Sequence, residues 1–311
     1  MRRKVNRVGT STLTVSLPSR WVKQQGIKQG DELELAIDRS VLSLTKGGFS
    51  HGKKSITVNI DDFEHLTLMR YFDVLYRDGY DTMVFIHNKD TIYYSKKGSE
   101  VDVRQALRTM VSRAVGSEIV SQTPKQTKIE CLVSASDQDL ERIEKRIYYL
   151  FKELLDEILA KAKKGAHGFY NEVYAMHDNI LKFTNYLLRE LEASDRPLVE
   201  KQLTYSVFMV VDKLVDKARH VVEKIILFGK TEKVDDLLKR IFEVFEGHFL
   251  ALHAGEFPSH ILTKRYMLVQ EIRQSSFTPE ELQVLMEANH FLDVLNEFIE
   301  LVIAKKVSGA P

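Results

Sequence analysis

Near the N-terminus, apolar residues alternate with Thr and Ser from Leu13 to Leu17, which is the two-residue period of a half-buried strand. Pro18 ends this strand, and we expect Ser19 to cap a short helix that ends at Gly26. Two more alternating segments predict strands at 33–37 and 41–44. The pattern therefore predicts a small β domain with one short helix, followed by a Gly-rich linker at 47–52.

The next segment switches between the period of strands and the period of helices. Helices are predicted from about residue 61 to 79 and around 107–114, and strands at 55–60, 83–86, 92–94, 118–120 and 128–133. An order of strand, helix, strand, strand, helix and strand, with one extra strand, is typical of a ferredoxin-like α+β sandwich. We find no catalytic constellation in this segment.

The C-terminal half has the pattern of long amphipathic helices. Ser136 and Asp139 form a capping-box pattern at the start of the first helix, whose apolar stripe continues to Ile158. The remaining helices are predicted at about 173–191, 194–228, 234–253, 258–274 and 279–305. Thr278 and Glu281 form a second capping box before the last helix. Six helices with short connections predict one or two up-and-down bundles.

The composition is that of an ordinary globular protein, with 44% hydrophobic and 29% charged residues among 311. No apolar run approaches the ~20 residues that span a bilayer, and no signal-peptide pattern follows the basic N-terminus. Cys131 is the only cysteine, which excludes an internal disulfide and fits a reducing compartment. We therefore expect a cytoplasmic protein without direct membrane insertion.

The charges are distributed unevenly along the chain. The first 30 residues contain seven Lys or Arg and no acid. Residues 1–47 carry a net charge of +5 and the rest of the chain carries −4, which the near-neutral total of +1 conceals. Attraction to nucleic acid is therefore expected only at the N-terminal domain. The alternative is that a basic end serves only to keep the protein in solution.

The N-terminal pattern resembles the AbrB/SpoVT/MazE family of swapped-hairpin DNA-binding domains. The residues that carry the resemblance are Arg3-Lys4-Val5, Arg7-Val8-Gly9, Leu17-Pro18 and Gly26-Ile27-x-x-Gly30-Asp31-x-Leu33. The resemblance implies an intertwined homodimer that contacts double-stranded DNA. The residues it implies for DNA contact are Arg3, Lys4, Arg7, Arg20 and Lys23. About 47 residues bury too little apolar surface for an independent core, which also favours a dimer.

Acidic residues form stripes on two of the predicted helices. On the third long helix the stripe faces away from the apolar positions and consists of Asp212, Asp216, His220 and Glu223. The last helix repeats the arrangement with Asp293, Glu297 and Glu300. One interpretation is a pair of solvated helix faces, with Lys213 and Lys217 neutralising the first. Because like charges four residues apart repel, a second interpretation is that the stripes gather a metal ion such as Fe, Zn, Ni or Mn.

The six helices and their acidic pairs resemble the PhoU family of phosphate-transport regulators over residues 137–305. Asp212-x-x-x-Asp216 fits the family's motif, whereas Asn289 replaces the first acid of the second copy and Lys182 follows Asp178 in the second helix. The resemblance implies two three-helix bundles with metal on their surface. The candidate ligands are Asp178, Asp212, Asp216, His220, Glu223, Asp293 and Glu300.

The sequence thus predicts a multidomain α+β protein: a swapped-hairpin domain at 1–47, an α+β module at 53–134 and a PhoU-like all-α body at 136–305. We expect a DNA-binding transcriptional regulator linked to phosphate uptake, whose body senses or relays the signal. The alternative is an adaptor that uses the N-terminal domain only to dimerise and docks on a phosphate ABC transporter or a sensor kinase. We do not expect an enzyme, because the sequence has no phosphate-binding glycine loop, nucleophile elbow or zinc-protease motif.

Overall fold

The computed structural model describes residues 2–38, 41–46, 53–133, 137–194, 196–253 and 260–308. The chain divides into two compact units, residues 1–52 and residues 53–311. The predicted linker at 47–52, Ser136 of the first capping box and the predicted helix start at 258 lie outside the described residues. Among the described residues, no helix combines the length and the apolar character needed to cross a membrane.

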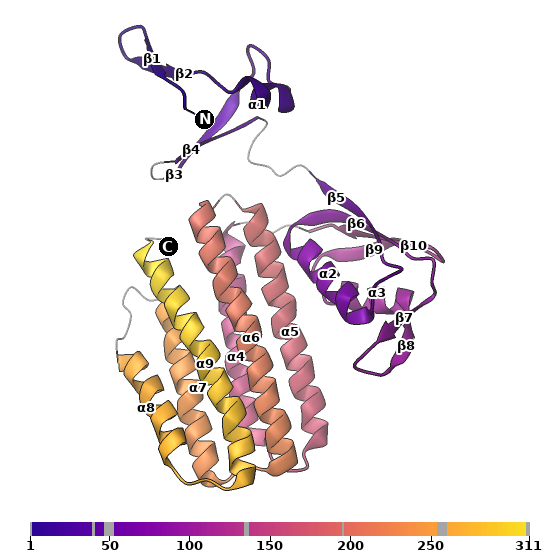
Figure 1. Cartoon of the computed structure of the whole chain (residues 1–311), viewed down its shortest axis with the longest axis vertical. Helices are drawn as coiled ribbons and strands as arrows, with labels where there is room; N and C mark the ends of the chain where they lie inside the picture. Colours follow the sequence, from indigo (N-terminus) through magenta and orange to yellow (C-terminus); the bar gives the residue numbers. More distant parts are fainter. Residues whose placement is uncertain are drawn as a thin grey trace. The chain divides into compact units, whose positions relative to one another are not determined.

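The N-terminal unit contains two short hairpins and one helix (Figure 1). Strands β1 (Val5–Val8) and β2 (Thr12–Val15) pair antiparallel, as do β3 (Leu33–Asp38) and β4 (Val41–Lys46), and α1 (Ser19–Gln24) carries Trp21. The expected cap at Ser19 is wrong, because Pro18 occupies the N-cap position without a side-chain hydrogen bond and Ser19 is already helical. Gly26 and Gly30 have φ angles of 58° and 92°, a conformation that favours glycine in the turns predicted there.

The second unit begins with an α+β module around a mixed four-stranded sheet in the order β5-β6-β10-β9. Its elements are β5 (Lys54–Asn59), α2 (His65–Arg77), β6 (Tyr80–Ile86), β7 (Thr91–Tyr94), β8 (Ser99–Asp102), α3 (Val103–Ser112), β9 (Ser117–Thr123) and β10 (Gln126–Cys131). The helices cover the sheet with an apolar core that includes Leu68, Phe72, Met83 and Phe85. Strands β7 and β8 form a separate hairpin.

The predicted ferredoxin-like arrangement is wrong. Strands β5 and β6 are hydrogen-bonded parallel neighbours joined through α2, whereas a ferredoxin-like sheet splits each βαβ unit by placing another strand between its two strands. The hairpin β7–β8 lies between β6 and α3 in sequence and forms a sheet of its own, and β10 pairs with β6. Both helices and every strand of the module except β8 were predicted, whereas the order of the strands in the sheet was not.

Six helices form the rest of the unit: α4 (Asp137–Lys161), α5 (His167–Ala193), α6 (Leu198–Phe228), α7 (Glu232–His253), α8 (His260–Gln274) and α9 (Pro279–Val307). Helices α6 and α9 pack along each other, with α4 and α5 beside α6 and with α7 and α8 beside α9 (Figure 1). The apolar stripe of α6 is fully buried, as predicted. The capping box of Thr278 and Glu281 at the start of α9 is also confirmed.

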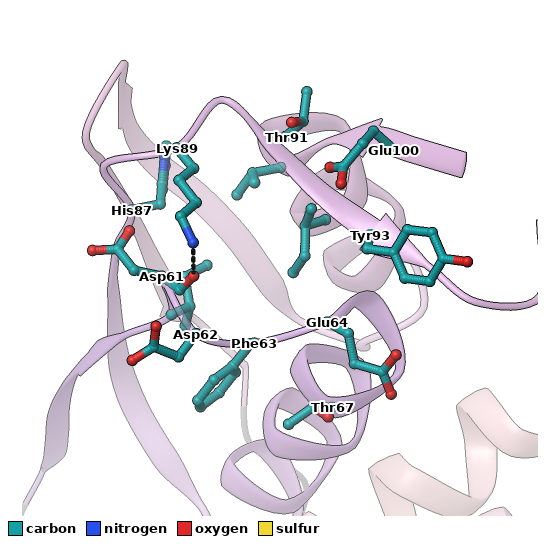
Figure 2. A pocket seen from close by; sticks show the side chains of 13 residues that line it. Asp61, Asp62, Phe63, Glu64, Thr67, His87, Lys89, Thr91, Tyr93 and Glu100 are labelled. Carbon is teal, nitrogen blue, oxygen red and sulfur yellow. Dashed lines mark hydrogen bonds between the residues drawn. The ribbon is translucent and has the colours of Figure 1, made fainter. Parts of the chain in front are cut away.

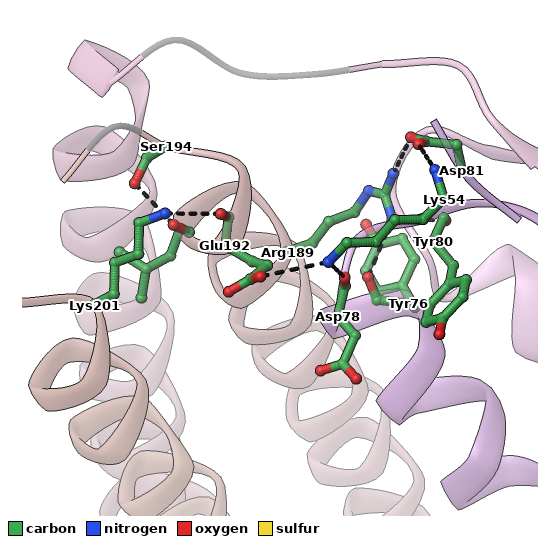
Figure 3. A network of polar contacts seen from close by, with 10 residues as sticks. Lys54, Tyr76, Asp78, Tyr80, Asp81, Arg189, Glu192, Ser194 and Lys201 are labelled. Carbon is green, nitrogen blue, oxygen red and sulfur yellow. Dashed lines mark hydrogen bonds and ion pairs between the residues drawn. The ribbon is translucent and has the colours of Figure 1, made fainter. Parts of the chain in front are cut away.

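The α+β module packs on the bundle through α2 and α5. Arg189 of α5 is 6% exposed and donates hydrogen bonds to the carbonyl oxygens of Tyr76 and Tyr80 and to Asp81 Oδ1, at 3.2, 2.9 and 3.0 Å (Figure 3). The last carbonyl groups of a helix have no partner within the helix. Arg189 therefore adds a second donor to the Tyr76 carbonyl at the end of α2, beside the Gly79 backbone N–H, and ties α2 and β6 to the bundle.

Lys54 and Lys201 extend this network to either side of Arg189 (Figure 3). The ammonium group of Lys54, at the start of β5, donates to the Asp78 carbonyl oxygen at 2.7 Å and reaches Glu192 Oε1 of α5 at 3.4 Å. Lys201 of α6 donates to the Glu192 carbonyl oxygen at 2.9 Å. Lys54 and Arg189 thus connect the module to the bundle through several polar contacts.

Candidate functional site

Asp212 and Asp216 of the α6 stripe lie where α2 and the end of α3 meet α5 and α6, a contact that we call the seam. The seam encloses a cavity of about 140 Å3 lined by side chains of both the module and the bundle, among them Asp73, Arg113, His177, Asp178, Asp212, Asp216 and Arg219. Arg77, which is 6% exposed, donates to Asn185 Oδ1 at 2.7 Å and lies 3.8 Å from Asp212 Oδ2. The interpretation of this face as solvated is therefore wrong for Asp212, whose side chain is only 14% exposed.

Asp216 and His177 form the centre of the seam. His177 Nε2 lies 3.0 Å from Asp216 Oδ1, which also accepts a hydrogen bond from Arg219 at 3.3 Å. Burial acts to raise the pKa of Asp216, but the hydrogen bond and charge of His177 and the charge of Arg219 lower that pKa to about 2. Burial likewise acts to lower the pKa of His177, and contacts with Asp178 and Asp216 outweigh it, so that the pKa is raised. The contacts within the pair therefore favour the charged form of each group.

Two other acids of the seam are less well compensated. Burial raises the pKa of Asp212, although the nearby Arg77 acts in the opposite direction. Burial also raises the pKa of Asp73 on α2, against the charges of Arg77 and Arg70. Both carboxyl groups are held in a low-dielectric contact between module and bundle, where their charged forms are disfavoured.

The structure brings together only some of the predicted metal ligands. Asp178, Asp212 and Asp216 reach the seam, where Asp178 pairs with Arg113 at 2.7 Å. His220 lies 4.0 Å from Glu287 of α9, and Asp293 lies 3.5 Å from Arg265. Glu223 and Glu300 are exposed on their helices.

This arrangement does not fit a metal centre. Within the ranges that the structure describes, no three His, Cys, Asp or Glu side chains are grouped so that they could hold an ion. The acids of the seam face Arg side chains, which satisfy the carboxylates without metal. Binding of Fe, Zn, Ni or Mn at these positions remains a prediction from the sequence.

The partners of the seam acids were not found from the sequence. Arg77, Arg113 and His177 gave no signal, because a side chain on α2, at the end of α3 or on α5 meets α6 only once the module has packed on the bundle. The i, i+4 spacing of Asp212 and Asp216 singled out the two acids of α6. It led to the prediction of a metal ion and gave no indication of the arginine and histidine side chains beside them.

The five basic residues predicted to contact DNA all lie on the surface of the N-terminal unit. Arg3 and Lys4 precede β1, Arg7 lies within β1 opposite Leu13, and Arg20 and Lys23 lie on α1 one turn apart. All five side chains are exposed, and none is hydrogen-bonded or ion-paired with another described residue. Their charges are therefore available to a polyanion.

Another lysine of the same unit has a structural role instead. Lys46 Nζ contacts Asp31 Oδ2 at 2.6 Å and donates to the Gly26 carbonyl oxygen, also at 2.6 Å. The side chain of Asp31 in turn accepts from the Lys28 backbone N–H at 2.8 Å, and the bonds from Lys46 and Lys28 lower the pKa of Asp31. These contacts join β4 to the turn that follows α1.

Residues 7–46 match a protein family described as "Antidote-toxin recognition MazE, bacterial antitoxin". The N-terminal unit is a MazE/AbrB-type swapped-hairpin domain. Domains of this type bind DNA and typically form dimers. No curated protein and no solved structure matches the chain.

The MazE/AbrB-type domain exposes apolar side chains on both of its hairpins. Leu13 and Leu35 are 66% and 61% exposed, and Val5, Val8, Val15 and Leu42 are similarly uncovered. An isolated two-stranded hairpin is marginally stable in water, and uncovered apolar strands are sites for pairing with another chain. This surface is what a domain that completes its core with a second copy is expected to show.

Proposed function

We propose that this protein is a DNA-binding transcriptional regulator that acts as a homodimer in the cytoplasm. The observation that carries the proposal is the MazE/AbrB-type domain with five exposed, uncommitted basic side chains: Arg3, Lys4, Arg7, Arg20 and Lys23. Together with its positive charge, this arrangement supports contact with the phosphate backbone of duplex DNA. The remainder of the chain carries a net charge of −4 and is expected to add little to DNA affinity.

We further propose that the regulator is linked to phosphate uptake and that the second unit senses or relays the signal. Support comes from the resemblance of the chain over residues 137–305 to PhoU proteins, and from helices that occur as two sets of three with α6 packed along α9. The seam supports the relay, because polar contacts couple the α+β module to the bundle. The proposed role is regulatory, not catalytic.

The DNA-binding proposal is tested by gel shift of the full chain against its own promoter region and against unrelated duplex DNA. The Arg3→Ala, Arg7→Ala double variant is expected to lose at least tenfold in affinity for both, since phosphate contacts are largely independent of sequence. Wild-type affinity is expected to fall steeply between 50 and about 200 mM salt as counterion release becomes less favourable. The Arg142→Ala, Lys145→Ala double variant, which removes the same charge from the exposed face of α4, serves as the matched control.

Two results would contradict this proposal. An affinity that stays constant with salt, or that survives the loss of Arg3 and Arg7, would show that the basic surface does not bind DNA. A stable dimer that shifts no DNA would instead favour the adaptor that docks on a phosphate transporter or a sensor kinase. The phosphate link is tested separately by mapping bound DNA across the genome, and binding sites away from phosphate-transport promoters would refute that link alone.

A further inference from the structure

One edge of the four-stranded sheet has none of the features that usually prevent pairing with another strand. The two edge strands are β5 and β9. Natural edge strands are commonly blocked by charged residues, prolines or β-bulges. Strand β9 contains Glu118 and one extra residue, Val120, where its register against β10 shifts. Residues 55–59 of β5 include no charged residue and no proline, and their register against β6 is regular.

Alternate residues of β5 direct their backbone groups to this free edge. The backbone N–H of Ile60 donates to the Ile86 carbonyl oxygen of β6 at 3.0 Å. Successive residues of a strand direct their N–H and C=O groups to opposite sides, so those of Ser55, Thr57 and Asn59 face away from β6. All three residues are exposed. Within the described part of the chain, their backbone groups have no other hydrogen-bond partner.

Both ends of β5 are held in place, so the free edge is preformed. At the start of the strand, the Lys54 backbone N–H donates to Asp81 Oδ2 at 2.9 Å. Just beyond its end, the Asp61 carboxylate accepts from the backbone N–H and the side-chain amide of Asn88, at 2.6 and 2.7 Å. Lys89 Nζ donates to the Asp61 carbonyl oxygen at 2.8 Å (Figure 2). A strand that is already ordered loses little conformational entropy when another strand pairs with it.

An apolar groove lies beside this edge. Its volume is about 700 Å3, and its lining includes Ile56 of β5 and Leu66, Tyr71 and Val74 of α2. The side chains of Tyr71 and Val74 are 41% and 51% exposed. Ile56 and Val58 pack against the module's core, so the side of β5 that they occupy is the side covered by α2. A strand added beside β5 therefore places every second side chain over the groove, and apolar side chains suit that place.

The chain itself contains a strand with the required pattern, namely β5. Ile56 and Val58 alternate with polar residues. Antiparallel pairing of a strand with its own copy has two-fold symmetry, the commonest symmetry of dimers. Domains of the MazE/AbrB type typically form dimers. Residues 47–53 connect β4 to β5 and reach about 25 Å at most when fully extended, so a dimer of that domain keeps two copies of β5 at an effective concentration on the order of millimolar.

We propose that β5 pairs antiparallel with β5 of a second copy, centred on Thr57, so that two four-stranded sheets join into one. Thr57 then lies opposite Thr57 of the second copy, and Ser55 lies opposite Asn59. The apolar side chains of each β5 cover the groove of the other chain. One short strand pair is much smaller than the interfaces of about 1,600 Å2 that hold stable complexes. The pairing therefore rests on the proposed homodimer, in which the N-terminal domains hold the two chains together.

Cysteine cross-linking of the full chain tests this pairing. Opposite residues of a hydrogen-bonded antiparallel pair have Cα atoms about 5.5 Å apart, which is within the range of a disulfide. In a Cys131→Ser background, oxidation of Thr57→Cys is expected to give covalent dimer at least tenfold faster than oxidation of Ser121→Cys. Ser121→Cys is the matched control, because it places the same exposed thiol on β9, the other edge of the sheet.

The mass of the chain before oxidation, measured by light scattering, separates this inference from the proposed function. A dimer in which Thr57→Cys cross-links no faster than Ser121→Cys would overturn the pairing of β5, leave the DNA-binding dimer standing and identify another protein as the source of the added strand. A monomer would overturn both. If the Thr57→Cys chain does not fold by circular dichroism, the Ser55→Cys, Asn59→Cys double variant, whose thiols oppose each other in the same register, provides the same comparison.

Discussion

At the scale of single residues, two buried arginines explain how the α+β module stays on the bundle. Arg189 and Arg77 are each 6% exposed, one on α5 and one on α2, and each reaches across to the other element or beyond it. A guanidinium group suits such a place because its planar set of donors can satisfy several acceptors at once. Removing either side chain takes a charged donor away from several carbonyl, amide or carboxylate oxygens at once.

Arg189→Met is therefore expected to lower the free energy of unfolding by about 2 kcal/mol, because a buried charged donor is lost to three acceptors, of which Asp81 is partly exposed. Methionine keeps most of the volume, so packing alone changes little. The measurement is urea denaturation followed by circular dichroism. Arg142→Met on α4, where the side chain is 82% exposed, is the control and should change stability little. Equal effects of the two substitutions would refute the role given to Arg189.

His177 predicts a pH dependence whose sign follows from its raised pKa. The charged form is stabilised in the fold by Asp178 and Asp216 and opposed by Arg219, so the contribution of His177 is complete below the unfolded pKa of about 6.5. The contribution is lost as pH rises through the raised folded pKa. His177→Gln should therefore cost about 1 kcal/mol at pH 5.5, a value kept low because Asp216 is partly exposed, and less at pH 8.5.

Urea midpoints of wild type and His177→Gln at the two pH values provide the measurement. His167→Gln, an exposed position at the start of the same helix, controls for loss of a histidine as such. A difference between wild type and His177→Gln that grows with pH would mean that the neutral ring, not the charged one, is stabilised in the seam. Asp216 does not interfere, because its pKa of about 2 lies far below this range.

At the scale of elements, apolar periodicity decides what could be predicted. The long helices were predicted nearly to their ends because each repeats its buried stripe over many turns, and the capping box at Thr278 fixed one start. Strand β1 was missed because Asn6 and Arg7 interrupt its apolar residues, and β8 because Ser99–Asp102 has almost none. The sheet order and the seam depend on contacts between distant segments, which no local pattern encodes.

At this scale we predict that the exposed apolar side chains of the two hairpins of the MazE/AbrB-type domain form the dimer contact. Leu13→Asp places a charge in the uncovered apolar row and is expected to shift the protein from dimer to monomer and to abolish DNA binding. Thr14→Asp adds the same charge to the adjacent position of β2, opposite the polar Asn6, and should leave the dimer intact. Size-exclusion chromatography with light scattering gives the mass of each. A monomeric wild type, or a dimeric Leu13→Asp, would show that this row is not the contact.

At the scale of the whole molecule, the net positive and net negative parts of the chain correspond to the two compact units. The unit of residues 1–52 contains the basic surface, and the unit of residues 53–311 contains both the seam and the free edge of β5. The predicted boundary between 53–134 and 136–305 separates two architectures, but the two belong to one compact unit. A ligand that binds the module or the bundle therefore binds the same compact unit.

Trp21 on α1 has a practical consequence for optical spectroscopy of this protein. It is the only tryptophan of the chain and belongs to the N-terminal unit, next to Arg20 and close to Lys23. Excitation at the red edge of the protein band therefore reports on α1 alone, while the 12 tyrosines report mainly on the rest. The intact, unlabelled chain therefore has separate fluorescence signals for the unit that is proposed to bind DNA and for the unit that contains the seam.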